Sequence, residues 1–170
     1  MLNRYLPTTP LATALAIFAL AFATIAGAWI FEALGYLPCD LCYLQRDPYY
    51  FGMPVALLTA LAAKQFASQG VARGGLMLLA AIFAIGVGLA VYHSGVETKL
   101  WQGPTACTGT AINGPANAGD LLAQLDTVKV VRCDAVSLRV FGLSLANWNI
   151  FISAAFVYLA VRAAFRHSEA

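Results

Sequence analysis

Charged residues are scarce in this chain, and their scarcity excludes most soluble folds. Of the 170 residues only 11% are charged, while 61% are hydrophobic. A soluble domain usually carries about 25% charged residues. A soluble fold of this size could not bury so much apolar surface. The sequence therefore predicts an all-α integral membrane protein.

The chain also lacks a strong net charge and the usual cofactor motifs. Its net charge of +2 gives no reason to expect nucleic acid as a partner. Haem attachment needs His directly after the second Cys of a C-x-x-C pair, and Tyr43 stands there. No dinucleotide or flavin fingerprint is present. If the protein carries out redox chemistry, elimination leaves a quinone as the mobile redox carrier available inside a bilayer.

Four apolar segments predict a four-transmembrane-helix bundle. Residues 11–31 contain no charged residue, and about 20 apolar residues are enough to cross a bilayer. Thr9 and Pro10 suit the N-cap and the first helical position, and Ser144 suits the cap of the last helix. We predict spans at residues 10–32, 48–64, 74–93 and 144–163, in a single membrane domain over residues 1–170.

One alternative for the first span is a secretory signal peptide, with Ala26-Gly27-Ala28 as a small-residue cleavage site. The apolar run is longer than the usual ~7–15 residues of such a signal. Further spans also follow it, so we favour a transmembrane helix.

The predicted loops are residues 33–47 and the long hydrophilic segment 94–143. Residues 118–125 form a short amphipathic pattern, which predicts a helix on the membrane surface. An even number of spans places both loops on one side, opposite the termini and the predicted turn at residues 64–73. Each side carries five cations, but those of the cysteine side are spread over a longer stretch. The cations on the side of the termini are denser, which favours cytoplasmic termini. All four cysteines would then face a compartment where disulfides persist.

Cys39 and Cys42 form the first cysteine pair, at the edge of the membrane. A structural disulfide between them would close a very small loop and stabilise little. A zinc site usually has two close Cys or His pairs, whereas 25 residues separate Cys107 from Cys133. We favour a redox-active pair. Arg46 either extends to a lipid headgroup or favours the Cys42 thiolate and binds a negatively charged or carbonyl-bearing partner.

Cys107 and Cys133 form the second pair, which fits either a structural or an exchanging disulfide. Closing this loop would stabilise the fold by roughly 3 kcal/mol. The small residues around Cys107 and the cation Arg132 beside Cys133 favour exchange. Two pairs on one side suggest a relay of thiol–disulfide exchange. His93 either ends the third span at the interface or takes a proton or cofactor role.

The chain resembles the DsbB family of bacterial inner-membrane disulfide-generating proteins. The matching residues, in chain order, are Pro38-Cys39-Asp40-Leu41-Cys42, Gln45-Arg46, Tyr92-His93, Gly95-Val96-Glu97, Cys107, Arg132-Cys133-Asp134 and residues 141–149. They run from the first loop to the last span, so the resemblance covers most of the chain.

The resemblance implies a protein of the bacterial inner membrane, with cytoplasmic termini and periplasmic cysteine loops. It would reoxidise the periplasmic thioredoxin-like dithiol oxidase DsbA and pass the electrons to ubiquinone or menaquinone. Carried over by position, Cys107 takes the attack of the partner's thiolate. The released Cys133 then attacks Cys39, and Cys42 becomes the thiolate that meets the quinone.

The resemblance also implies cofactor contacts, with Arg46 orienting the quinone and His93 near its headgroup. The Asp47-Pro48 pair departs from the expected pattern, because a new helix starting there would interrupt a helical pairing of Cys42 with Arg46.

Two other readings of the sequence remain open. One is a vitamin-K-epoxide-reductase-like protein, although that family places its C-x-x-C near the end of the bundle. The other is a structural or metal-binding membrane protein whose cysteines never exchange.

Overall fold

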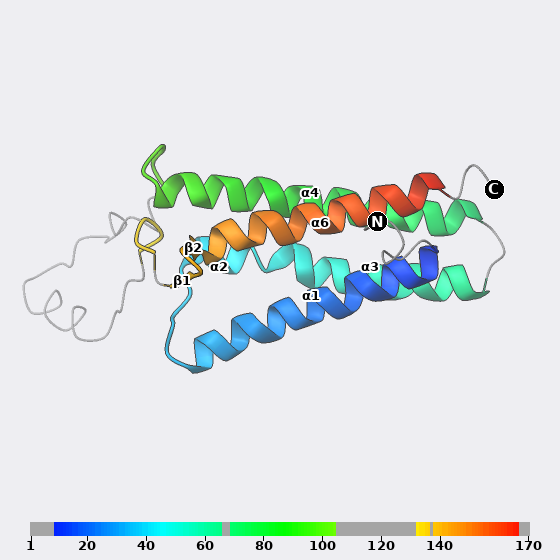
Figure 1. The fold of residues 1–170 in the computed structure, drawn as a ribbon, viewed down its shortest axis with the longest axis horizontal. Coiled ribbons are helices and arrows are strands. Elements are labelled where there is room, and N and C mark those ends of the chain that lie inside the picture. Colours follow the sequence, from blue (N-terminus) through cyan, green and yellow to red (C-terminus); the bar gives the residue numbers. More distant parts are fainter. Residues whose placement is uncertain (1–8, 66–68, 105–131, 137, 167–170) are drawn as a thin grey trace, which may run out of the picture.

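The computed structural model describes residues 9–65, 69–104, 132–136 and 138–166. Four long helices pack side by side along one axis, as Figure 1 shows. They are α1 (Pro10–Ala33), α3 (Asp47–Gln65), α4 (Gln69–Glu97) and α6 (Leu145–Arg166). Three of them, α1, α4 and α6, are long and apolar enough to cross a membrane. The chain is therefore a helical membrane protein, as predicted.

Three short elements gather at one end of this bundle (Figure 1). They are the helix α2 (Asp40–Leu44) and the antiparallel strands β1 (Arg139–Val140) and β2 (Leu143–Ser144). The end of α3, the starts of α4 and α1 and the end of α6 lie at the opposite end. Cys39 caps α2, Cys42 lies within it, and Cys133 is buried in one cluster with Cys39, so these three cysteines belong to the α2 end of the bundle. The predicted helix at residues 118–125 lies outside the described residues, as does Cys107.

Local capping explains where two of the helices begin. The Thr9 hydroxyl accepts a hydrogen bond from the Ala12 amide at 3.2 Å, and Pro10 takes the first helical position. The Ser144 hydroxyl accepts from the Asn147 amide, also at 3.2 Å. Each cap satisfies an amide that has no partner within its helix. Both capping residues are those predicted from the sequence.

Helix α4 is longer at both ends than the span predicted at residues 74–93. It begins at Gln69 and continues to Glu97, so the turn predicted at residues 64–73 is shorter than expected. Gly75, near its start, has a packing role. A Cβ on Gly75 would lie 2.3 Å from the Thr59 hydroxyl oxygen, so glycine allows α4 to approach α3 closely.

Aromatic rings fill the middle of the bundle. Tyr49, Phe83 and Phe156 meet edge to face, with centroids 4.7 to 6.1 Å apart. Gly52 makes room for this cluster, because a Cβ there would lie 2.8 Å from the Phe83 ring. The cluster holds α3, α4 and α6 in a fixed register, and this register positions the polar side chains above it.

Candidate functional site

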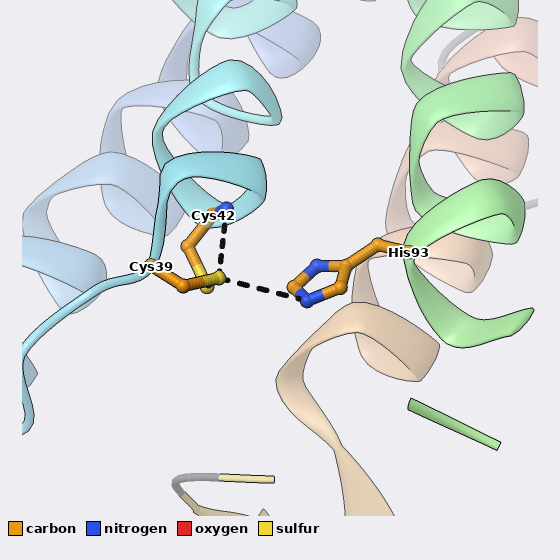
Figure 2. A group of neighbouring side chains, drawn as sticks. All are labelled: Cys39, Cys42 and His93. Atoms are coloured by element: carbon orange, nitrogen blue, oxygen red, sulfur yellow. Dashed lines mark hydrogen bonds between the residues drawn. The ribbon is translucent and has the colours of Figure 1, made fainter. Parts of the chain in front are cut away.

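Cys39 is held at the N-terminus of α2. Its backbone is extended, and its sulfur accepts a hydrogen bond from the Cys42 amide at 3.3 Å. The two sulfurs lie 2.8 Å apart, with Cys39 buried and Cys42 partly buried. Figure 2 shows this pair facing α4. The local helix, which we did not predict within residues 33–47, thus brings both sulfurs together and gives Cys39 the capping position.

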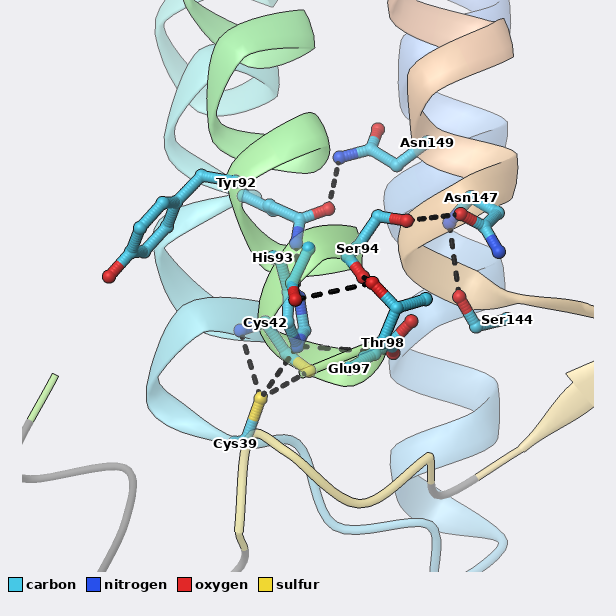
Figure 3. Close-up of polar contacts among 12 residues, drawn as sticks. Cys39, Cys42, Tyr92, His93, Ser94, Glu97, Thr98, Ser144, Asn147 and Asn149 are labelled. Carbon is cyan, nitrogen blue, oxygen red and sulfur yellow. Dashed lines mark hydrogen bonds and ion pairs between the residues drawn. The ribbon is translucent and has the colours of Figure 1, made fainter. Parts of the chain in front are cut away.

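His93 meets the cysteines from α4 (Figures 2 and 3). Its Nε2 lies 3.6 Å from the Cys39 sulfur and 4.0 Å from a carboxylate oxygen of Glu97, one helical turn along. His93 is 3% exposed, so it is a core residue of the site. Since α4 continues past it, His93 does not end the helix at the interface, which was one of the two readings from the sequence.

Polar side chains from α3, α6 and the α2–α3 junction continue inward from His93. The side-chain nitrogen of Gln45 contacts His93 Nδ1. Asn149 donates to the Gln45 carbonyl oxygen at 2.6 Å, and the Tyr49 hydroxyl donates to the Asn149 carbonyl oxygen. From the sequence, Gln45, Glu97 and Asn149 were only residues that match the family and Tyr49 was a membrane-interface aromatic, and none was predicted to be a site residue. The available signal was Asn149, a polar residue inside a predicted span, where such residues are usually functional.

The geometry distributes charge unequally between the two thiols. The hydrogen bond from Cys42, and then that from His93, lower the pKa of Cys39 to about 5 although burial opposes them. The same bond to Cys39, together with burial, raises the pKa of Cys42. In the dithiol state Cys39 is therefore the thiolate, whereas the sequence pointed to Cys42. The cause is the hydrogen bond shared with the Cys42 sulfur and then the one with His93, a contact between α2 and α4 that the sequence spacing did not reveal.

Arg46 lies beside the cysteines but points toward α1. Its guanidinium donates to the Glu32 carboxylate at 2.8 Å and covers the Tyr43 ring at 4.9 Å. The Tyr43 hydroxyl donates to the other Glu32 oxygen at 3.0 Å. Helix α2 ends before Arg46 and α3 begins after it, so one continuous helix does not carry both Cys42 and Arg46. The interruption foreseen at Asp47-Pro48 is present.

One cavity of about 370 Å³ joins these groups. Cys39, Cys42, Arg46 and His93 all line it, and much of the remaining lining is apolar and includes Phe31, Trp148 and Ile152. Ligand cavities commonly combine an apolar wall with a few polar groups that set orientation. The space therefore suits a flat, largely apolar molecule with polar atoms at one edge.

Cys133 lies next to the first cysteine pair. It is disulfide-bonded, only 1% exposed, and belongs to the same buried cluster as Cys39, Leu41 and Val96. Arg132 pairs with Asp134 at 2.7 Å on the surface, so its charge is shared with a carboxylate. The structure thus brings four of the predicted site residues around one cavity and places a fifth, Cys133, beside them.

The donor atoms of Cys39, Cys42 and His93 lie within 4.8 Å of one another, so a metal ion is the obvious alternative occupant. Two thiolates bound tetrahedrally to zinc at about 2.3 Å would be about 3.8 Å apart. The observed sulfur separation is 2.8 Å. The site therefore fits a dithiol that closes into a disulfide better than it fits a zinc ligand pair.

A helical membrane bundle with a buried dithiol beside a disulfide-bonded cysteine defines the class of membrane thiol–disulfide proteins. The family model of disulfide bond formation protein DsbB matches residues 10–163, and the chain belongs to this family. No curated protein and no solved structure gives a significant match. The protein therefore takes part in disulfide bond formation.

Proposed function

We propose that this protein oxidises a DsbA-like periplasmic dithiol protein and passes the electrons to a membrane quinone. The observation that carries the proposal is the common burial of Cys133 and Cys39 in one cluster. A disulfide-bonded cysteine and a dithiol in one buried cluster form the minimum needed for exchange between them.

The exchange sequence balances in electrons and protons. We assign Cys107 as the disulfide partner of Cys133, so that the substrate's thiolate attacks Cys107 and Cys133 leaves as a thiolate. Cys133 then attacks Cys39 of the Cys39–Cys42 disulfide, and Cys42 leaves with the electron pair. The substrate's second thiol releases it as a disulfide, and Cys107 leaves as a thiolate. Cys107 then attacks Cys133, which re-forms their disulfide and releases Cys39. The Cys39–Cys42 disulfide is restored as two electrons and two protons pass to the quinone. Overall, one dithiol loses two electrons and two protons.

In the cavity, a quinone would supply the acceptor for these two electrons and two protons. Cys42 and Arg46 line the wall that would meet its carbonyl edge, and the apolar wall suits its ring and tail. The Glu32 pairing holds Arg46 in place, so the guanidinium is oriented in advance. Once Cys39 is bonded to Cys133, Cys42 is the remaining thiol of the pair and no longer shares a proton with Cys39.

We also propose that α3 crosses the bilayer with the other three long helices. The termini would then lie in the cytoplasm and the cysteine end of the bundle in the periplasm of a bacterial inner membrane. In support, α3 is 19 residues long and packs along α1 and α4.

The decisive test is quinone-dependent oxidation of a reduced thioredoxin-like dithiol protein by the purified chain. Cys42→Ser should reduce turnover to background while the thermal unfolding midpoint stays close to that of the parent, because serine keeps the size of the side chain. Normal turnover by Cys42→Ser would rule out the relay. Stoichiometric zinc in the purified chain would instead favour the metal-binding alternative.

A further inference from the structure

A chain of buried side-chain hydrogen bonds ends on the inner face of His93. Two hydroxyls, those of Tyr49 and Ser153, donate to the carbonyl oxygen of Asn149. The Asn149 amide donates to Gln45 at 2.6 Å, and the Gln45 side-chain nitrogen faces His93 Nδ1. Gln45 and Ser153 are buried at 7% and 0% exposure. No step of the exchange sequence uses this chain directly.

The donor and acceptor inventory of these groups restricts the state of His93. An amide NH₂ can only donate, so the His93 nitrogen that faces Gln45 must be an acceptor without a proton. In a neutral imidazole the proton then lies on Nε2. That nitrogen faces the Cys39 sulfur at 3.6 Å and the Glu97 carboxylate at 4.0 Å. Both are acceptors, so the two sides of the ring require the same tautomer.

We propose that Tyr49, Asn149 and Gln45 are positioning residues that hold His93 as its Nε2–H tautomer, with that proton directed at the Cys39 sulfur. The tautomer itself follows from the orientations of the Asn149 and Gln45 amides in this chain. Its use, to stabilise the Cys39 thiolate when this sulfur leaves or enters a disulfide, rests on the function proposed above. In the described part of the chain the titratable groups around this point are Cys42 from α2 and His93 and Glu97 from α4, while Arg46 is paired with Glu32.

Nitrogen-15 NMR of histidine-labelled, reduced protein in detergent micelles tests this assignment without quinone or partner. The chain has only two histidines, and His167→Gln assigns their signals. In the parent near neutral pH, we expect His93 Nδ1 to give the signal of an unprotonated, hydrogen-bonded nitrogen and Nε2 that of a protonated one. A protonated Nδ1 in the parent would overturn the proposal.

Asn149→Asp should reverse the donor–acceptor direction of the hydrogen bonds between residue 149, Gln45 and His93. A carboxylate has no donor, so the Gln45 NH₂ must turn toward it and present its carbonyl to His93 Nδ1, which must then gain a proton. Asn147→Asp is the matched control. It makes the same change on the same helix, but Asn147 is not part of this series of hydrogen bonds: it accepts a hydrogen bond from Ser94 at 2.6 Å. The proposal fails if Asn149→Asp leaves Nδ1 unprotonated, or if Asn147→Asp protonates it too.

Gln45→Met covers the case in which Asn149→Asp does not fold. It keeps the side-chain length and removes the amide donor, so the Nδ1 signal should move to that of a nitrogen without a hydrogen bond. An unchanged signal would overturn the proposal. For the functional half, Asn149→Asp should slow quinone-dependent turnover about tenfold, a change of about 1.4 kcal/mol, and Asn147→Asp less than twofold. Equal rates would show that the tautomer does not serve the exchange, whereas an inactive parent would count against the proposed function alone.

Discussion

The middle of the bundle and its cysteine end are built from the same helices but by different means. In the middle, Phe83 and Phe156 pack with ring centroids 4.7 Å apart, among alanines and glycines that allow close approach. At the cysteine end, Gln45, His93 and Glu97 are nearly buried and bonded to one another or to the cysteines. Buried polar groups cost free energy unless they are paired, so this end is organised for chemistry rather than for stability.

Tyr49 connects the two regions. Its ring packs against Phe83 and Phe156, while its hydroxyl bonds to Asn149. The apolar cluster therefore sets the position along the bundle axis at which the hydrogen-bond chain begins. If the comparison is right, changes in the middle should alter stability and leave thiol reactivity unchanged. Changes at the cysteine end should alter thiol reactivity and leave stability nearly unchanged.

The largest effect is expected from Phe83→Ala. It should lower the free energy of unfolding by about 3–5 kcal/mol, because it leaves a cavity among residues that cannot close over it. Thermal and denaturant unfolding in detergent measure the loss. Phe151→Ala is the control, since Phe151 is 60% exposed and should cost far less. Equal losses would mean that the aromatic cluster is not the core of the bundle.

The next largest effect concerns the reactivity of Cys39. With a pKa of about 5, its thiolate fraction at pH 7 is about a hundredfold that of a thiol with a pKa of 9. In the reduced protein, alkylation at Cys39 should stay constant above about pH 6 and halve near pH 5, which mass spectrometry of the Cys39 peptide measures. A midpoint above pH 8 would contradict the arrangement described.

The lowered pKa also sets the sign of a stability change. The unfolded thiol has a pKa of 9.0. Ionisation of Cys39 therefore adds stability to the folded dithiol form as pH rises from about 5 to about 9 and none below about pH 5, while above pH 9 the raised pKa of Cys42 opposes a further gain. The disulfide form should not show this dependence, which makes it the internal control.

Gly52→Ala should give a smaller loss of stability, of about 1–3 kcal/mol, because the added Cβ would overlap the Phe83 ring. Gly74→Ala is a matched control in α4 with open space around its Cβ. It should be neutral or slightly stabilising, since alanine favours a helix over glycine. Unfolding midpoints of the two variants compare them directly, and a loss at Gly74 that equals the loss at Gly52 would count against the close packing.

The smallest effect is expected from Arg46→Ala. We expect the apparent KM for quinone to rise about tenfold, or about 1.4 kcal/mol, with little change in the KM for the dithiol partner. Arg73→Ala is the control, because Arg73 covers the Phe165 ring at 5.2 Å and does not line the cavity. Unchanged quinone affinity in Arg46→Ala would remove Arg46 from the quinone site.

The β1–β2 hairpin was not predicted, because its backbone geometry has only a weak signal in the sequence. The β1–β2 hairpin turns at Phe141 and Gly142, both with positive φ, of 51° and 82°. A two-residue turn of this kind usually has Asn or Asp before the glycine, and phenylalanine in that place gave no signal. Trp148 holds the hairpin to α6 through a 2.9 Å bond to the Val140 carbonyl.

By itself the sequence determined the membrane-protein class, the caps at Thr9 and Ser144, the close Cys39–Cys42 pair and the family. These features depend on composition or on contacts within about four residues, so they can be read along the chain. Only the tertiary structure decided that Cys39 carries the thiolate, that Arg46 pairs with Glu32, and that Gln45 and Asn149, 104 positions apart, share a hydrogen bond. The physical reason is that helix rotation and packing set which side chains meet, and neither is visible in the order of residues.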